Sequence, residues 1–194
     1  MGLRFVVVTS VTRDDLPDGG SGHFARTIRE IRRRVPAALI EVLVPDFQGS
    51  DGALRTVVDA RPDVINHNLE TVLSLYPKVR PGADYHRSLH LLKHVGELSP
   101  DIPTKSGLMV GLGESPEELR QALSDLLEAE CRILTLGQYL QPSSDHLPVE
   151  RFLPPEEFGQ WREIALNMGF RQVASGPFVR SSYRAGELYE ALKS

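Results

Sequence analysis

Cysteine is almost absent from this sequence, since Cys131 is the only one among 194 residues. A single cysteine excludes an internal disulfide framework and leaves few thiolates with which the chain could hold a metal centre. Long apolar runs are also missing: stretches such as Phe5 to Val8 are far shorter than the roughly 20 residues that cross a bilayer. The N-terminus lacks the build of a signal peptide. We therefore expect a cytoplasmic protein that binds no membrane.

A large excess of charge of either sign is missing as well. The chain has 22 basic and 26 acidic residues, a formal net charge of -4, and this balance gives no reason to expect nucleic acid as a partner. The basic run from Arg32 to Arg34 comes at the end of a predicted helix, where cations offset the partial negative charge of the helix terminus. Hydrophobic residues make up 41% of the chain, enough for one core, so we expect residues 1–194 to form a single domain.

Six strand-like segments alternate with helical patterns along the chain. Val, Ile and Leu concentrate in residues 3–10, 39–45, 63–70, 105–112, 132–140 and 171–177. Between them, residues 22–34 place apolar side chains three and four positions apart, and residues 115–130 begin with Ser115 and Glu118 at the spacing of a capping box. Strand then helix, repeated with mostly short connections, predicts an α/β fold with a parallel sheet, either open or curled into a barrel.

Polar side chains gather where these strands end, and ligands of parallel α/β folds bind at the carboxyl ends of the strands. The candidates after the first and third strands are Ser10, Arg13, Asp14, Asp15, Asn66, Asn68 and Glu70. Alternation along a strand places Asn66, Asn68 and Glu70 on one face and His67 on the other. Burying an unpaired polar group costs about 1–3 kcal/mol. Such a row therefore indicates side chains that line a ligand site, rather than side chains that only bridge parts of the structure.

Two further motifs have competing interpretations. The glycine-rich residues 107–115 precede a predicted helix whose N-terminus could contact a nucleotide or another anion. They lack the lysine and hydroxyl residue of a P-loop and the glycine spacing of a dinucleotide fingerprint. His86, His90 and His94 lie four residues apart, but no carboxylate completes a metal site on that face, which favours a solvated helix.

Near the end of the chain, residues 180–183 read RSSY between a strand-like segment and a last helix. Taken alone, the hydroxyl of Ser181 or Ser182 indicates a helix cap, because a short oxygen-bearing side chain satisfies backbone N–H groups that have no partner in the first turn.

Six longer motifs follow one another along the chain. They are TSVTRDDLPDGG, VINHNLET, YPKVRPGADYHRSLHLLK, PTKSGLMVGLGE, LTLGQYLQPS and GPFVRSSYRA. Together they resemble the C-terminal two thirds of lipoyl synthases, which are radical S-adenosylmethionine (SAM) enzymes. The resemblance implies a partial TIM-like (β/α)6 barrel of the radical SAM type with its first strand missing, and a C-terminal extension at about residues 171–194.

The resemblance also implies roles for individual residues. The residues it implies for SAM are Ser10, Arg13, Asp14, Asp15, Asn66, Asn68, Glu70, Gly111 and Glu114. The first four are candidates for the methionyl amino group, the next three for the ribose and methionine, and the last two for the surroundings of the adenine. Ser182 is implied as an oxygen ligand of an auxiliary iron–sulfur cluster, an exception among soft thiolate ligands. No residue is implied as a further catalytic group.

The departure from this family is the lack of cysteine. Lipoyl synthases carry two cysteine triads, one for the 4Fe–4S cluster that cleaves SAM and one for the auxiliary 4Fe–4S cluster, and neither triad is present. Cys131 alone cannot replace them, because each such cluster needs about three or four protein thiolates. We therefore expect this polypeptide by itself to be inactive in lipoyl formation and to expose an unpaired sheet edge at residues 3–10.

The implied activity is the radical insertion of two sulfur atoms into a protein-bound octanoyl chain. Its implied partners are an octanoylated lipoyl carrier domain or protein and a reducing system such as ferredoxin or flavodoxin. Two alternatives from other classes stay open. One is a cluster-free barrel enzyme that binds phosphorylated substrates at helix N-termini. The other is a noncatalytic subunit of a split enzyme, which completes the fold of a cysteine-bearing partner.

Overall fold

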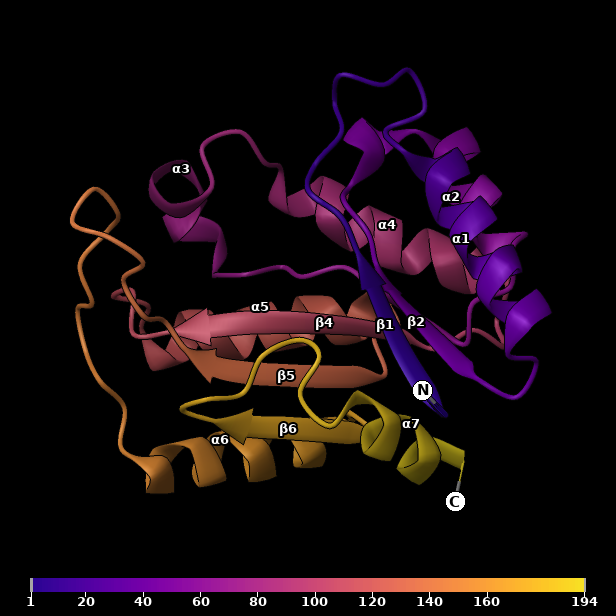
Figure 1. Ribbon diagram of the computed structural model, residues 1–194. Coiled ribbons are helices and arrows are strands. Elements are labelled where there is room, and N and C mark those ends of the chain that lie inside the picture. The colour runs from indigo at the N-terminus through magenta and orange to yellow at the C-terminus, as the bar shows by residue number, and fades with distance from the viewer. Residues whose placement is uncertain (1, 194) are drawn as a thin grey trace.

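Six parallel strands form one sheet whose spatial order follows the chain order (Figure 1). The strands are β1 (Phe5–Thr9), β2 (Leu39–Leu43), β3 (Val64–Asn66), β4 (Thr104–Val110), β5 (Ile133–Gln138) and β6 (Gln172–Gly176). In this computed structural model, which describes residues 2–193, each strand pairs in parallel with the next one. All six strands overlap the predicted segments, so the predicted α/β fold with a parallel sheet is confirmed.

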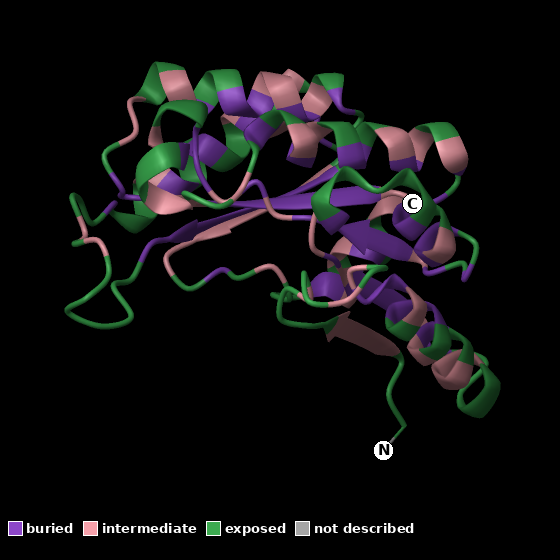
Figure 2. Cartoon of the chain, turned by 90° about the horizontal axis from the view of Figure 1, so that it is seen from above, coloured by how far each residue is buried: buried purple, intermediate pink, exposed green. Residues whose placement is uncertain are grey.

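Helices connect the strands along the outer side of the sheet (Figures 1 and 2). The α-helices are α1 (Ser21–Arg34), α2 (Asp51–Val58), α3 (Tyr76–Val79), α4 (Tyr85–Leu98), α5 (Pro116–Glu128), α6 (Pro155–Met168) and α7 (Ala185–Lys193), and the 3-10 helices are η1 (Phe47–Gly49) and η2 (Leu73–Leu75). Sequential parallel strands with helices outside form a partial TIM-like (β/α)6 barrel, as predicted. The segment predicted as a C-terminal extension contributes β6 and α7. Within the described residues, no helix has the length and apolar character needed to cross a membrane.

The main core fills the space between the sheet and the outer helices. Strand residues such as Ile40, Ile65 and Leu134 point outward into it, and each is fully buried. From the helices, Phe24 of α1 and Leu123 of α5 pack against the same cluster. Strand residues that alternate with these face the inner side of the sheet, so the apolar and polar positions of each strand are sorted onto opposite faces.

A second, smaller core closes the end of the sheet where the strands begin. Tyr189 of α7 packs there with Val64 and Ile133, the first residues of β3 and β5. Phe5, the first residue of β1, joins this cluster, and its ring lies 6.2 Å from that of Tyr189. Because α7 covers this end, polar ligands have access to the inner face from the opposite end, where the strands finish.

Two local predictions about helix ends are confirmed. Ser115 caps α5, and its side chain and that of Glu118 each accept a hydrogen bond from the other's backbone N–H, which is the predicted capping box. Arg32 lies in the last turn of α1 and donates to the Ala38 carbonyl at 3.0 Å and to the Asp63 carboxylate at 2.8 Å. The basic run therefore ends a helix and ties it to the following strands.

Candidate functional site

A buried ion pair and an amide form the floor of the site on the inner face. The Lys105 Nζ lies 2.9 Å and 3.1 Å from the two carboxylate oxygens of Glu41, and Asn66 Nδ2 donates to Glu41 Oε1 at 3.1 Å. The three side chains come from β4, β2 and β3, and none is more than 1% exposed. Each charge neutralises the other, and the amide satisfies a further lone pair, which makes the buried pair tolerable.

Asn68 and Glu70 lie beyond this floor, toward the carboxyl end of the strands. Asn68 Nδ2 donates to Glu70 Oε1 at 3.1 Å. Glu70 has a positive φ of 70°, and its backbone N–H and carbonyl bond Gly107 and Met109 of β4 at 2.9 and 2.7 Å. Burial raises the pKa of the Glu70 carboxyl, while the Asn68 amide and the Arg80 charge oppose that shift. The chain thus leaves the strand in a strained conformation that holds the carboxylate beside the amide.

Two amide oxygens of this row lack a partner. Asn66 Oδ1 and Asn68 Oδ1 are buried and accept no hydrogen bond among the described residues. Gly107 makes room for the second amide, because a Cβ there would lie 2.9 Å from Asn68 Oδ1. Leaving such acceptors unpaired costs about 1–3 kcal/mol each. A ligand that brings N–H or O–H donors would satisfy them, so the residues present fit a polar ligand such as SAM.

His67 lies on the opposite face of the strand, as alternation predicts, and has a structural role. Its Nδ1 is 2.9 Å from the Val44 carbonyl and its Nε2 is 3.0 Å from Ser88 Oγ. A carbonyl only accepts hydrogen bonds, so Nδ1 carries a proton. Burial lowers the pKa of His67. The side chain connects β3 to α4 and does not reach the inner face.

Of the four candidates that follow β1, three line two different hollows. Arg13 and Asp15 bond each other at 2.6 and 2.7 Å, and the Arg13 hydrogen bond lowers the pKa of the Asp15 carboxyl. Ser10 donates to the adjacent Val11 carbonyl at 2.9 Å, and it lines a hollow of about 310 Å³ together with Arg13. Asp14 lines a different hollow of about 540 Å³. The structure therefore does not bring all four residues together.

Gly111 and Glu114 form a closed turn at the end of β4. The two Glu114 carboxylate oxygens accept from the Gly111 and Leu112 N–H groups at 2.6 and 2.9 Å. Gly111 has a φ of 96°, and a Cβ there would come 2.3 Å from the Arg151 carbonyl oxygen, so this turn requires glycine. The Ser115 and Glu118 N–H groups are used in the capping box, so four backbone N–H groups around the start of α5 are already bonded to side chains of the same segment.

Ser182 is exposed in the turn that precedes α7. Among the described residues, neither its hydroxyl nor that of Ser181 makes a hydrogen bond, so the capping interpretation is wrong. The residues before this turn pack closely against β5. A Cβ at Gly137 of β5 would lie only 2.3 Å from the Val179 carbonyl oxygen, so this contact requires glycine. The Ser182 hydroxyl is thus available to a ligand.

The cysteine of this chain does not fit an iron–sulfur cluster. Cys131 is 1% exposed, its thiol lies 3.4 Å from the Ile133 carbonyl, and burial raises its pKa to about 12. Cluster ligation needs several thiolates at one place. Within residues 2–193, no group of three or more His, Cys, Asp or Glu side chains is placed to hold a metal ion. The described residues therefore provide no cluster site of their own.

Three functional candidates were missed from the sequence. Glu41 and Lys105 are the only charged residues within the six strands as the structure bounds them, whereas the longer predicted segments also contain Arg4, Asp63, Glu70, Arg132 and Arg171. Arg80 follows α3 and donates to the Asn68 carbonyl and to the Tyr76 hydroxyl, both at 3.3 Å. Nothing in its local sequence marks it, because its neighbours are brought together by the fold.

Comparisons by sequence relate this chain to a known family and to named relatives. A family model described as the Radical SAM superfamily matches residues 1–126. A lipoyl synthase from Caldanaerobacter subterraneus subsp. tengcongensis is 60% identical over 185 residues, which cover 95% of this chain and 65% of that protein. One from Desulfotalea psychrophila is 57% identical over 189 residues, covering 97% and 63%. The chain thus spans less than two thirds of the length of these curated relatives.

Solved structures share the fold at low sequence identity. A methylornithine synthase has a TM-score of 0.62 at 13% identity and is covered over 67% of its length, against 99% of this chain. A domain of a pyruvate-formate lyase-activating enzyme from Bacteroides vulgatus has a TM-score of 0.63 at 11% identity, with coverage of 87% of this chain and 98% of that domain. At these identities the likeness concerns the fold alone.

Proposed function

Because this chain belongs to the radical SAM superfamily and matches lipoyl synthases over at least 95% of its length, we propose that it forms the SAM-binding barrel of a lipoyl synthase. The proposed reaction inserts two sulfur atoms into the octanoyl chain of a lipoyl carrier domain or protein, in the cytoplasm. Ferredoxin or flavodoxin supplies the electrons. Unactivated carbons offer no acidic proton to a general base, which is why radical chemistry suits this substrate.

The pair of unsatisfied amide oxygens on the inner face carries this proposal. Asn66 and Asn68 present buried acceptors beside the Glu70 carboxylate, at the end of the sheet where ligands of this fold class bind. In the proposal, these three residues bind the ribose and methionine of SAM. Gly111 and Glu114 lie beside the adenine, where the carboxylate fixes the shape of the turn. Ser10, Arg13, Asp14 and Asp15 are the candidates near the methionyl amino group.

Two 4Fe–4S clusters belong to the proposed enzyme, and we place their cysteine ligands outside these 194 residues. The single buried Cys131 and the partial coverage of the relatives support that placement. Ser182 is the ligand that this chain contributes to the auxiliary cluster, and its exposed hydroxyl, which has no hydrogen-bond partner among residues 2–193, supports the role. This chain by itself is then inactive in lipoyl formation.

The test fuses this chain to the remaining third of the Caldanaerobacter relative and reconstitutes it anaerobically with iron and sulfide. We expect the fusion to form lipoyl product and 5′-deoxyadenosine from an octanoylated carrier and SAM, and the chain alone to form neither. Ser182→Ala should lower the ratio of lipoyl product to 5′-deoxyadenosine, and Ser181→Ala serves as the milder control. If the fusion forms no product, the proposed function is contradicted. If Ser182→Ala leaves the ratio of lipoyl product to 5′-deoxyadenosine unchanged, Ser182 is not a cluster ligand.

The same lack of thiolates supports a second arrangement, in which this chain is a noncatalytic subunit completed by a cysteine-bearing partner. Obligate co-purification with such a partner, and activity that appears only after mixing the two chains, would favour this arrangement over the single-chain enzyme.

A further inference from the structure

Both inner-face amides are bonded through their nitrogen to a carboxylate. Asn66 Nδ2 donates to Glu41 Oε1, and Asn68 Nδ2 donates to Glu70 Oε1, each at 3.1 Å. An ionised carboxylate only accepts hydrogen bonds, so the end of an amide that faces it is the nitrogen. The oxygens Asn66 Oδ1 and Asn68 Oδ1 are therefore the ends left without a partner among the described residues.

The carboxylate beside Asn66 is itself held by an ammonium. Lys105 Nζ lies 2.9 and 3.1 Å from the two Glu41 oxygens. Because both oxygens already accept from the ammonium, Glu41 has nothing to donate, and the amide meets it only through N–H. A buried ion pair often stabilises a protein no more than apolar residues of the same volume. Stability alone thus gives no reason for an acid and a base at this place.

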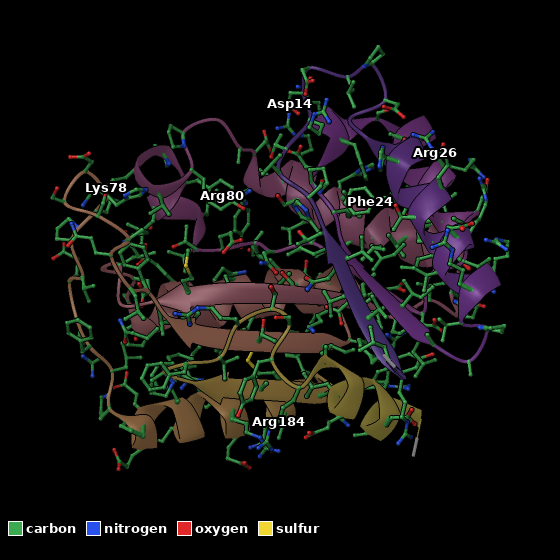
Figure 3. The ribbon with its side chains drawn as sticks, in the orientation of Figure 1. Asp14, Phe24, Arg26, Lys78, Arg80 and Arg184 are labelled. Carbon is green, nitrogen blue, oxygen red and sulfur yellow. The ribbon has the colours of Figure 1, made fainter. Side chains whose placement is uncertain are left out.

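The backbone under both amides is fixed as well. The Asn66 carbonyl accepts the Val44 N–H at 2.9 Å, and the Asn68 carbonyl accepts from Arg80 Nη1 at 3.3 Å. Figure 3 labels Arg80 on the segment that follows α3. With the backbone held, the remaining choice for the Asn66 side chain is which end of its amide faces Glu41, and the hydrogen-bond network makes that choice. The acceptor is thus in place before a ligand arrives.

We infer that Glu41, held by Lys105, is a positioning residue that sets the polarity of the site. It turns the Asn66 amide so that the oxygen is presented to the ligand, and the site then selects a hydrogen-bond donor at this point over a group that only accepts. A buried acceptor that meets no donor carries a free-energy penalty, which is the source of the selectivity. The inference rests on the proposed function, in which the ligand is SAM and the donor is a ribose hydroxyl.

The experiment measures binding to the full chain by isothermal titration calorimetry for SAM and for two analogues in which fluorine replaces the 2′- or the 3′-hydroxyl. Fluorine is close to a hydroxyl in size but donates no hydrogen bond. The wild type should bind one of the analogues about 10-fold more weakly than SAM, as expected when a buried acceptor loses its donor.

The double variant Glu41→Gln with Lys105→Met removes both charges together. Its glutamine can accept as well as donate, so the Asn66 amide is free to turn, and the 10-fold disadvantage of the analogue should fall to about 2-fold. A second double variant, Glu41→Leu with Lys105→Met, replaces the ion pair by apolar side chains and should lose the discrimination in the same way.

Matched variants separate positioning from folding. Asn66→Ala removes the acceptor and should bind SAM and the analogues equally. Glu128→Gln, an exposed change of the same type at the end of α5, should keep the wild-type ratio. A variant that only loosens the fold weakens all three ligands by the same factor, so an unchanged ratio in the double variants overturns the inference.

The wild type separates this inference from the proposed function. If it binds SAM and both analogues equally, the role of Glu41 is overturned while SAM binding stands. If it binds none of the three ligands, the SAM site of the proposed function is overturned together with the inference.

Discussion

Glu70 shows how a single residue combines strain, burial and a poised charge. Its positive φ turns the chain at a point beyond the end of β3, and its backbone N–H and carbonyl bond Gly107 and Met109 of β4. Its carboxyl keeps one hydrogen bond, from Asn68. Conformations of this kind persist where the surrounding structure holds them, and they concentrate at ligand sites. The buried Glu70 carboxylate should therefore lower the stability of the folded protein, by an amount that depends on pH.

We predict that Glu70→Gln stabilises the protein increasingly as the pH rises. Burial raises the pKa of this carboxyl in the folded state. An acid with a raised pKa favours folding below its ordinary pKa of about 4.3, and that contribution is lost as the pH rises through the folded-state pKa. Glutamine cannot ionise, so the variant escapes this loss. Urea unfolding of both proteins between about pH 4 and pH 7 measures the difference. A difference that stays constant or shrinks with rising pH would contradict the prediction.

At the scale of elements, the Glu41–Lys105 ion pair joins strands that are not neighbours. Glu41 lies on β2 and Lys105 on β4, so the pair crosses the inner face of β3, where Asn66 bonds the same carboxylate. The short strand β3 is thus fixed from both sides by polar contacts as well as by the sheet. This bonding also sets which way the Asn66 amide points.

Removing one partner of the Glu41–Lys105 ion pair should destabilise the fold. We expect Lys105→Met to lower the free energy of unfolding by about 3–5 kcal/mol, because it leaves the buried Glu41 charge without a partner. The double variant Glu41→Gln with Lys105→Met should recover part of that loss, since no isolated charge remains. Lys93→Met on the exposed side of α4 is the control, with a change within about 0.5 kcal/mol. Urea denaturation followed by circular dichroism measures the wild type, the Glu41→Gln and Lys105→Met single variants, the double variant and the control. Strictly additive losses in the double variant would argue against the coupling.

At the scale of the whole molecule, the sheet leaves β1 as an edge strand. Among the described residues β1 pairs only with β2, and Figure 2 shows it at intermediate burial, unlike the central strands. Helix α7 covers its beginning through Phe5 and Tyr189 but not its full length. An edge strand with free backbone groups is a template for pairing with another chain. The unpaired edge expected at residues 3–10 is therefore present.

We predict that the isolated chain associates through this edge. Val7→Lys places a charge on the inner face of the edge strand, which should shift the protein toward monomer, because inward-pointing charges oppose edge-to-edge pairing. Val11→Lys is the control: Val11 is 77% exposed but lies beyond the strand, so its replacement should leave association unchanged. Size-exclusion chromatography with light scattering gives the masses. A wild type that is monomeric at all concentrations, or a Val7→Lys variant that still associates, would speak against this edge.

The sequence by itself determined the order and type of the elements, the capping box of α5, and the row of Asn66, Asn68 and Glu70 on one face. These features depend on residue types at short spacings, through the two-residue period of a strand and the hydrogen bonds of a helix end. Only the tertiary structure decided which polar groups meet. It paired Glu41 with Lys105 across 64 positions, closed Glu114 onto its own turn, separated Asp14 from Ser10, and set Arg80 against Asn68. Those outcomes depend on strand order and loop paths, because a charge takes whichever partner the fold brings within reach, and local sequence does not encode that distance.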